Sequence, residues 1–271
     1  MTDAPPRGPM QFPATWDAVA AGYADLATHF ARYAEEALRL VPPAASHRVL
    51  DVAAGPGTLA FVAAKRVARV VAVDFSPGMI EQITLRAAKD GVSNLEAAVM
   101  DAQALGLADG SFDAAYCLFG VMFFPERGRA FSELRRVLAP SGRVLVATWA
   151  PIERRPLMKL GFDALAEAIP ELPAMPKGDL QHPDECVKEL TLAGFRDVRA
   201  SFFSAALHVD SAEHYLGVME RSGAPFAMLK KRLGAEGWVA AVERVLAALR
   251  RQIPEGGVDL DAEAILTHGA R

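Results

Sequence analysis

The chain has 271 residues, of which 52% are hydrophobic and 23% are charged. That is enough apolar material for a packed core, in one enlarged domain or two. The formal net charge of −4 argues against a general nucleic-acid binder, because such proteins need a basic surface.

Residues 1–13 contain four prolines and no basic-then-apolar signal pattern, which predicts a flexible lead-in. Residues 15–40 are rich in alanine, with apolar residues at helical spacing, and predict one helix that ends before Pro42. The longest apolar run, residues 114–124, is too short for a membrane span. We therefore expect a cytoplasmic protein with no membrane span.

Residues 41–150 alternate short apolar runs with amphipathic stretches. Strands are predicted over residues 48–52, 70–74, 95–99, 112–117 and 143–149, and helices over 58–66, 77–90 and 127–138. Strands that alternate with helices at this spacing imply βαβ units and a parallel sheet.

Residues 151–271 are less regular. The predicted elements are helices over 155–169 and 184–193, a strand within 196–209, helical segments over 211–251 and a final strand over 258–267. The expected fold class is α/β, with a Rossmann-like, seven-stranded, mostly parallel sheet, helices on both faces and a helical lid insertion. We expect three regions. Residues 1–40 form a lead-in and cap helix, and residues 41–150 form a cofactor-binding core. Residues 151–271 complete the sheet and include an acceptor-binding lid at about 211–251.

A glycine turn follows the first predicted strand, where Gly55 and Gly57 allow a ligand to approach the backbone closely. With Ala60 they match the G-x-G-x-x-A pattern of dinucleotide-binding proteins. Asp51, at the end of the strand, would repel a pyrophosphate. S-adenosyl-L-methionine (SAM) carries an ammonium and a sulfonium, and both favour a nearby negative charge.

Two further acids follow the next two strands. Asp74 is placed to accept hydrogen bonds from ribose hydroxyls, although NAD-binding proteins use an acid in the same place. Asp101 is placed to accept from an adenine amino group, beside the backbone amide of Ala102. Because the ends of parallel strands share one edge of a sheet, Asp51, Asp74 and Asp101 are expected to surround one ligand.

Apolar residues near these acids have two interpretations, ligand contact or core packing. Phe75 and Met79 are candidates to cover the adenine. Leu118 and Phe119 end the fourth strand, where the reactive methyl group should lie. For Phe123 and Phe124 we favour core packing.

These motifs resemble those of class I SAM-dependent methyltransferases, in the broad group that includes ubiquinone- and menaquinone-type enzymes. The resemblance covers roughly residues 15–150 and rests on four segments, Val49–Gly57, Val73–Met79, Asp101–Leu105 with Phe112-Asp113, and Glu133–Gly142. One departure is Ala53, where many members have glycine.

The resemblance implies roles for the matching positions. Gly55 and Gly57 would approach the methionine part of SAM, and Tyr23 would close over the cofactor. Asp74 would hold the ribose, Met79 would pack on the adenine, and Asp101 with Ala102 would contact the adenine edge. The cofactor-binding candidates are therefore Tyr23, Asp51, Ala53, Gly55, Gly57, Asp74, Phe75, Met79, Asp101, Ala102, Leu118 and Phe119.

Methyl transfer from a sulfonium is an in-line displacement, in which alignment supplies much of the rate. A base is needed only if the nucleophile holds its proton, and His214 and Tyr23 are the candidates. No cluster of residues suggests a metal. The expected partner is a small, apolar or aromatic acceptor, methylated on oxygen, nitrogen or carbon, and a homodimer is compatible with the sequence. The alternatives are an NAD(P)-dependent oxidoreductase and a non-catalytic SAM-binding protein.

Overall fold

The computed structural model describes residues 8–171 and 179–271, except for the side chains of residues 24 and 25. Its strands are β1 (Arg48–Val52), β2 (Arg69–Asp74), β3 (Leu95–Val99), β4 (Phe112–Leu118), β5 (Leu138–Trp149), β6 (Arg196–Val209) and β7 (Val258–Ala270). Its α-helices are α1 (Pro13–Asp17), α2 (Ala27–Leu40), α3 (Thr58–Ala64), α4 (Pro77–Asp90), α5 (Arg127–Val137), α6 (Pro156–Ala168), α7 (Pro183–Leu192), α8 (Ala212–Ser222) and α9 (Ala224–Arg250). Short 3₁₀ helices are η1 (Pro9–Gln11), η2 (Gly22–Leu26), η3 (Val121–Phe123) and η4 (Ile152–Arg154).

The seven strands form one sheet in the order β3-β2-β1-β4-β5-β7-β6. Strands β1 to β5 pair in parallel, and β7 pairs antiparallel with both β5 and β6. The predicted Rossmann-like, mostly parallel sheet is confirmed. Asp51 lies opposite Ala72 of β2 and Tyr116 of β4, so the carboxyl ends of these strands meet at one edge.

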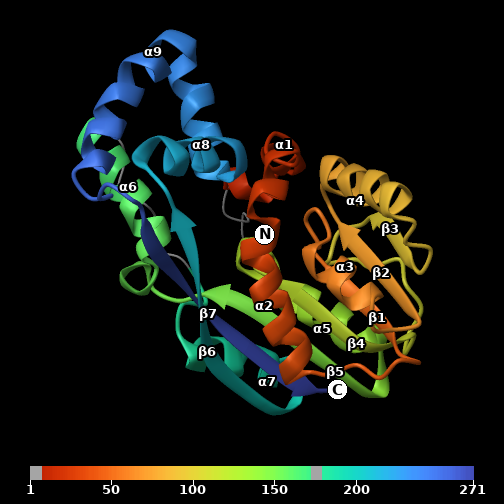
Figure 1. Ribbon diagram of the computed structural model, residues 1–271. Coiled ribbons are helices and arrows are strands. Elements are labelled where there is room, and N and C mark those ends of the chain that lie inside the picture. The colour runs from red at the N-terminus through yellow and green to blue at the C-terminus, as the bar shows by residue number, and fades with distance from the viewer. Residues whose placement is uncertain (1–7, 172–178) are drawn as a thin grey trace, which may run out of the picture.

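Helices cover both faces of the sheet. Side chains of α2, α3 and α4 pack on one face around Val49 and Tyr116, and those of α5 and α7 pack on the other around Leu50 and Cys117. A third hydrophobic cluster joins α6, α8 and α9 to the ends of β6 and β7. Figure 1 shows these three helices grouped at one end of the molecule, with α1 between α8 and α4.

The N-terminal region differs from the prediction. The single helix expected over 15–40 is divided into α1, η2 and α2. At Gly22 the backbone passes so close to α8 that a Cβ atom would lie 2.0 Å from the Arg221 carbonyl oxygen. Among the described residues of the predicted lead-in, 9–11 and 13 are helical. The Trp16 indole donates to the Met10 carbonyl oxygen at 2.9 Å, which fixes η1 against α1.

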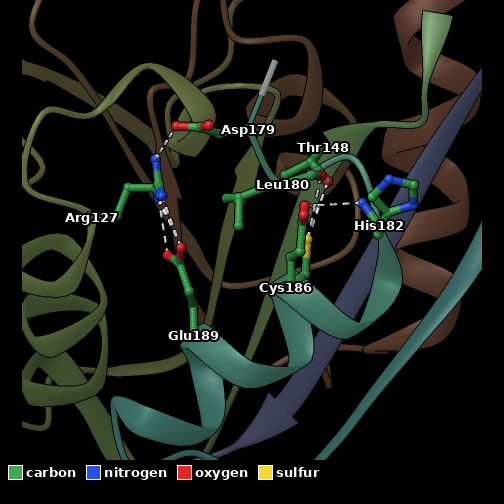
Figure 2. Close-up of polar contacts among 8 residues, drawn as sticks. Arg127, Thr148, Asp179, Leu180, His182, Cys186 and Glu189 are labelled. Carbon is green, nitrogen blue, oxygen red and sulfur yellow. Dashed lines mark hydrogen bonds and ion pairs between the residues drawn. The ribbon is translucent and has the colours of Figure 1, made fainter. Parts of the chain in front are cut away.

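Helix α7 is fastened to β5 and α5 by buried and half-buried polar contacts (Figure 2). The Thr148 hydroxyl donates to the Leu180 carbonyl oxygen at 2.9 Å and lies 3.4 Å from the Cys186 sulfur. The Arg127 guanidinium, from the start of α5, donates to the Glu189 carboxylate of α7 at 2.9–3.2 Å and to Asp179 at 3.0 Å. These bonds fix Asp179, Leu180 and α7, which follow residues 172–178, a segment outside the described residues.

Candidate active site

A cavity of about 430 Å³ lies at the carboxyl edge of the sheet, where β1, β2, β3 and β4 end. Its volume is within the range of small-molecule sites, about 300–1,000 Å³. Eleven of the predicted cofactor residues line it, namely Tyr23, Asp51, Ala53, Gly55, Asp74, Phe75, Met79, Asp101, Ala102, Leu118 and Phe119. The three strand-end acids therefore lie around one cavity.

Asp74 is buried at the end of β2, with 6% of its surface exposed. One carboxylate oxygen accepts the Gly55 N–H at 2.9 Å, and the other accepts the Ser76 N–H at 2.9 Å. Each oxygen keeps further acceptor capacity. The carboxylate thus joins the glycine turn to the start of α4 and can still accept hydrogen bonds from a ligand in the cavity.

Asp51 is buried at the end of β1 and 2% exposed. One of its oxygens accepts the Ala60 N–H of α3 at 3.0 Å. Burial, with a smaller contribution from the charge of Asp74, raises the pKa of the Asp51 carboxyl to about 8. A positively charged ligand group nearby would favour the ionised form and lower that pKa.

Asp101 is exposed and lies on a turn after β3. Its carboxylate accepts the Gln103 N–H at 2.8 Å and a Gln103 side-chain N–H at 3.0 Å. Ala102 is buried beside it. Gln103, a loop residue without a motif signal of its own, also lines the cavity.

The two glycines of the turn have different environments. Gly55 has a φ of +55°, and a Cβ built on it would meet no atom within 4 Å, so it opens onto the cavity. Gly57 has a φ of +83°, but a Cβ there would lie 2.9 Å from Ile83 and 3.2 Å from Phe61. Gly57 is absent from the cavity lining, so its small size serves packing between α3 and α4.

Ala53 and Phe119 have positive φ angles of +53° and +62°, in a region that favours glycine. Both residues line the cavity. Gly120 lies directly opposite Ala53, and a Cβ at position 120 would be 2.3 Å from the Ala53 Cβ. The methyl group of Ala53 is thus accommodated by the absence of a side chain at Gly120.

This pairing predicts the effect of substituting Gly120. We expect Gly120→Ala to lower the free energy of unfolding by about 1–3 kcal/mol through overpacking, measured by urea denaturation. Adding Ala53→Gly should recover part of the loss because it removes the clashing methyl group. Gly128→Ala is the control, since a Cβ there meets nothing within 4 Å. A Gly120→Ala protein as stable as the parent would contradict the pairing.

The N-terminal segment forms one wall of the cavity, through Met10, Gln11, Pro13 and Trp16. It is tied to the start of α4 by Asp17, whose carboxylate accepts from the Ser76 hydroxyl at 2.5 Å and from the Gly78 N–H at 2.9 Å. The described part of the predicted lead-in therefore belongs to the site. The proline content of residues 1–13 predicted a flexible segment. Its described part is instead held in place by contacts with Trp16.

Another part of the cavity lining is aromatic. Phe30, Phe119, Phe123 and Phe124 line the cavity, and the Phe123 ring lies 5.2 Å from that of Trp16. Both side chains are half-buried and line the cavity. Phe124 also packs against the core cluster around Leu50 and Cys117, as expected, whereas Phe123 belongs to the cavity lining and not to that core.

The two predicted bases are placed differently. Tyr23 lines the cavity, and its ring is stacked on Phe30 with a centroid distance of 5.8 Å. Burial and the charge of Asp74 raise the pKa of its phenol to about 12, so the group keeps its proton at neutral pH. His214 lies outside the cavity lining, exposed, with Nδ1 2.9 Å from the Asp210 carboxylate. Neither arrangement favours a general base.

The large apolar side chains of the segment predicted as a lid, residues 211–251, pack away from the cavity. Met219, Phe226 and Trp238 are buried in the cluster that joins α8 and α9 to α6. None of them lines the cavity, whereas Trp16 of α1 does. The described helices of 211–251 thus support the wall of the site from behind.

Comparison with known proteins identifies the domain. A methyltransferase domain model matches residues 49–142. Demethylmenaquinone methyltransferases of Clavibacter sepedonicus and Thermus thermophilus are 39% and 40% identical over 133 and 124 residues, which is 48% and 44% of this chain. The alignments cover 52% and 55% of those relatives, so the chain spans about half of their length.

The fold also occurs in solved structures. The [4+2]-cyclase SpnF superposes with a TM-score of 0.56 and 21% identity, over 88% of this chain and 80% of that one. At this identity the likeness concerns the fold alone. None of the described helices is long and apolar enough to cross a membrane. These comparisons identify a methyltransferase domain at residues 49–142, within a Rossmann-like sheet.

Proposed function

We propose that the protein transfers a methyl group from SAM to a small, apolar or aromatic acceptor. The observation that carries this proposal is one cavity lined both by Asp51, Asp74 and Asp101 and by aromatic side chains. Acids at three strand ends suit a nucleoside with positive charges, and an apolar wall suits an uncharged ring or chain. The methyltransferase relatives support the same reaction class.

The residues present fit the cofactor. Asp74 retains acceptor capacity for ribose hydroxyls, and Gly55 leaves open space beside the turn. Met79 and Phe75 are apolar neighbours for an adenine, with Asp101 and Ala102 at its edge. When bound, SAM would supply an electrophilic methyl group on sulfur.

The protein's own contribution would be alignment and exclusion of water. Phe30, Phe119 and Phe123 restrict the space next to the strand ends, and Tyr23 would offer a phenolic O–H as a hydrogen-bond donor. Holding two reactants in line supplies about 7–11 kcal/mol of the barrier in favourable cases. No basic side chain is required if the acceptor atom has a free lone pair.

Incubation with labelled SAM tests the proposal. A panel of small phenols, amines and acids should include molecules that acquire the label, and a variant at Asp74 should label them more slowly. Transfer only to protein or nucleic acid would refute the proposed acceptor class. Binding of SAM without transfer to any acceptor would favour the non-catalytic alternative.

The proposal also divides roles along the chain. Residues 41–150 would bind the cofactor, and residues 1–40 and 151–271 would complete the acceptor side. A homodimer is the assembly to test, by light scattering at several concentrations. Binding of NADH in place of SAM would revive the oxidoreductase alternative, which the comparisons do not favour.

A further inference from the structure

Residues 10–26, which we call the strap, lie between two helical regions of the protein. Figure 1 shows α1, the central helix of the strap, between α4 and α8. Met10, Trp16 and Tyr23 of the strap line the cavity. Because the strap forms one wall of the cavity, the contacts that hold it in place bear on how a bound cofactor leaves.

On the side of α4, the strap is held by the carboxylate of Asp17. This carboxylate accepts from the Ser76 hydroxyl at 2.5 Å and from the Gly78 N–H at 2.9 Å, and both bonds reach the same oxygen. Ser76 is the N-cap residue of α4, and Gly78 lies in its first turn. The negative charge of Asp17 therefore lies at the positive end of the α4 dipole, which is a favourable arrangement.

The same serine connects the strap with the acid proposed to bind the ribose. The Ser76 backbone N–H donates to Asp74 at 2.9 Å, while the Ser76 hydroxyl donates to Asp17. Met79, the proposed neighbour of the adenine, is 2% exposed and packs in one apolar cluster with Ala20 of the strap. The strap is thus joined to the cofactor-binding residues by a polar contact and by an apolar one.

The strap approaches α4 so closely that position 78 has no room for a side chain. A Cβ built on Gly78 would lie 3.0 Å from the Asp17 carboxylate oxygen and 3.3 Å from the Asp17 Cα atom. Gly78 does not have a positive φ, and alanine is a better helix former than glycine, so α4 itself would accept alanine there. The small size of Gly78 therefore serves the contact with the strap.

On the side of α8, the strap is held by close backbone packing. A Cβ at Gly22 would lie 2.0 Å from the Arg221 carbonyl oxygen, so the two segments are in direct contact. Ala224, at the start of α9, is 3% exposed and belongs to the same cluster as Ala20. Asp17, in contrast, is exposed, and water can replace its hydrogen bonds at a modest net cost. The bonds of Asp17 are therefore the contacts of the strap that open most readily.

We propose that Asp17 is a positioning residue that holds the strap closed beside the bound cofactor and so sets the rate at which the cofactor leaves. Asp17 is absent from the cavity lining, so it acts through Ser76, Gly78 and the strap and does not touch the ligand. Release begins when water replaces the bonds of Asp17 and the strap moves away from α4. The proposal rests on the cofactor site described above, and it concerns departure of the cofactor and not methyl transfer itself.

Surface plasmon resonance, with the full chain immobilised and S-adenosylhomocysteine as the probe, measures association and release separately. We expect Asp17→Ala to release the probe about tenfold faster, in line with the loss of a charged hydrogen bond, with little change in the association rate. Asp17→Asn keeps an oxygen that can accept both bonds, so its release rate should lie between those of the alanine variant and the parent. Gly78→Ala keeps Asp17 but displaces the strap, and should also speed release. Asp90→Ala, at the other end of α4, is the matched control and should release the probe like the parent.

Hydrogen exchange follows the strap itself. In the parent protein, S-adenosylhomocysteine should slow amide exchange over residues 13–26. Asp17→Ala should restore fast exchange there in the bound protein, while residues 48–52 of β1 stay protected in both proteins. A general loss of stability would instead speed exchange in both segments.

Three outcomes would overturn the proposal. One is an unchanged release rate in Asp17→Ala, or in Gly78→Ala if the first variant does not fold. Another is slower association with unchanged release, which would mean that the substitution distorts the site. Both leave the proposed function intact. The third is failure of the parent protein to bind S-adenosylhomocysteine, which would refute the proposed function as well.

Discussion

Replacing Asp74 by alanine is expected to weaken SAM binding by about ten- to a hundredfold. The variant would lose the charged hydrogen bonds that we propose Asp74 makes to the ribose, and such bonds contribute about 1.5–3 kcal/mol each. It also loses the bonds that hold Gly55 and Ser76 on either side of the carboxylate. Isothermal titration calorimetry with SAM and with S-adenosylhomocysteine measures the effect directly.

Two further variants separate the possible causes. Asp74→Asn keeps one acceptor oxygen and the size of the side chain, so it should lie between the alanine variant and the parent. Asp90→Ala removes an exposed acid at the end of α4 that forms an ion pair with Arg86 and does not line the cavity, so it should leave affinity unchanged. A folded Asp74→Ala protein with unaltered affinity would show that the cofactor binds elsewhere.

The second large effect is a pH dependence of SAM binding through Asp51. Because the pKa of its carboxyl is raised to about 8, the group is mostly protonated in the free protein at pH 7. A cationic ligand favours the ionised form, so binding should release a proton. Affinity should therefore rise as the pH increases from 6 to 8 and level off above 8, since the carboxyl is then already ionised.

Calorimetry in two buffers of different ionisation enthalpy would count the protons released. Asp51→Asn should remove this proton release and flatten the Asp51-dependent part of the pH profile for SAM binding. This comparison separates the titration of Asp51 from titration of the ligand itself.

The stability of the free protein should show the opposite trend with pH. Its folded carboxyl holds a proton that the unfolded chain has lost, so the free energy of unfolding should fall as the pH rises from about 4 to about 8. Identical pH profiles for the parent and Asp51→Asn would contradict this account.

The core of the fold was predictable because its strands have strong local signals. The runs at 48–52 and 95–99 match β1 and β3 at both ends, and the helix from Pro77 to Asp90 ends at a glycine with positive φ. Each of these segments combines an apolar pattern with clear turn residues. The same local signals placed Asp51, Asp74 and Asp101 at one edge of the sheet.

The remaining features depend on contacts between distant segments. Helical periodicity over 15–40 could not reveal the close approach of Gly22 to α8. The rings of Phe123 and Trp16 are in contact beside the cavity although more than a hundred residues separate them in the sequence. The bond from Ser76 to Asp17 joins positions 59 residues apart, and no local pattern shows it.

The position of β7 has a consequence for assembly during synthesis. Strands β1 to β5 can associate once residue 149 has left the ribosome, but β6 pairs only with β7, which follows it by about fifty residues. Until then the edge of β5 is open, and an open edge invites pairing with other chains. We infer that the nascent protein is most vulnerable to aggregation while α6 to α9 are being translated.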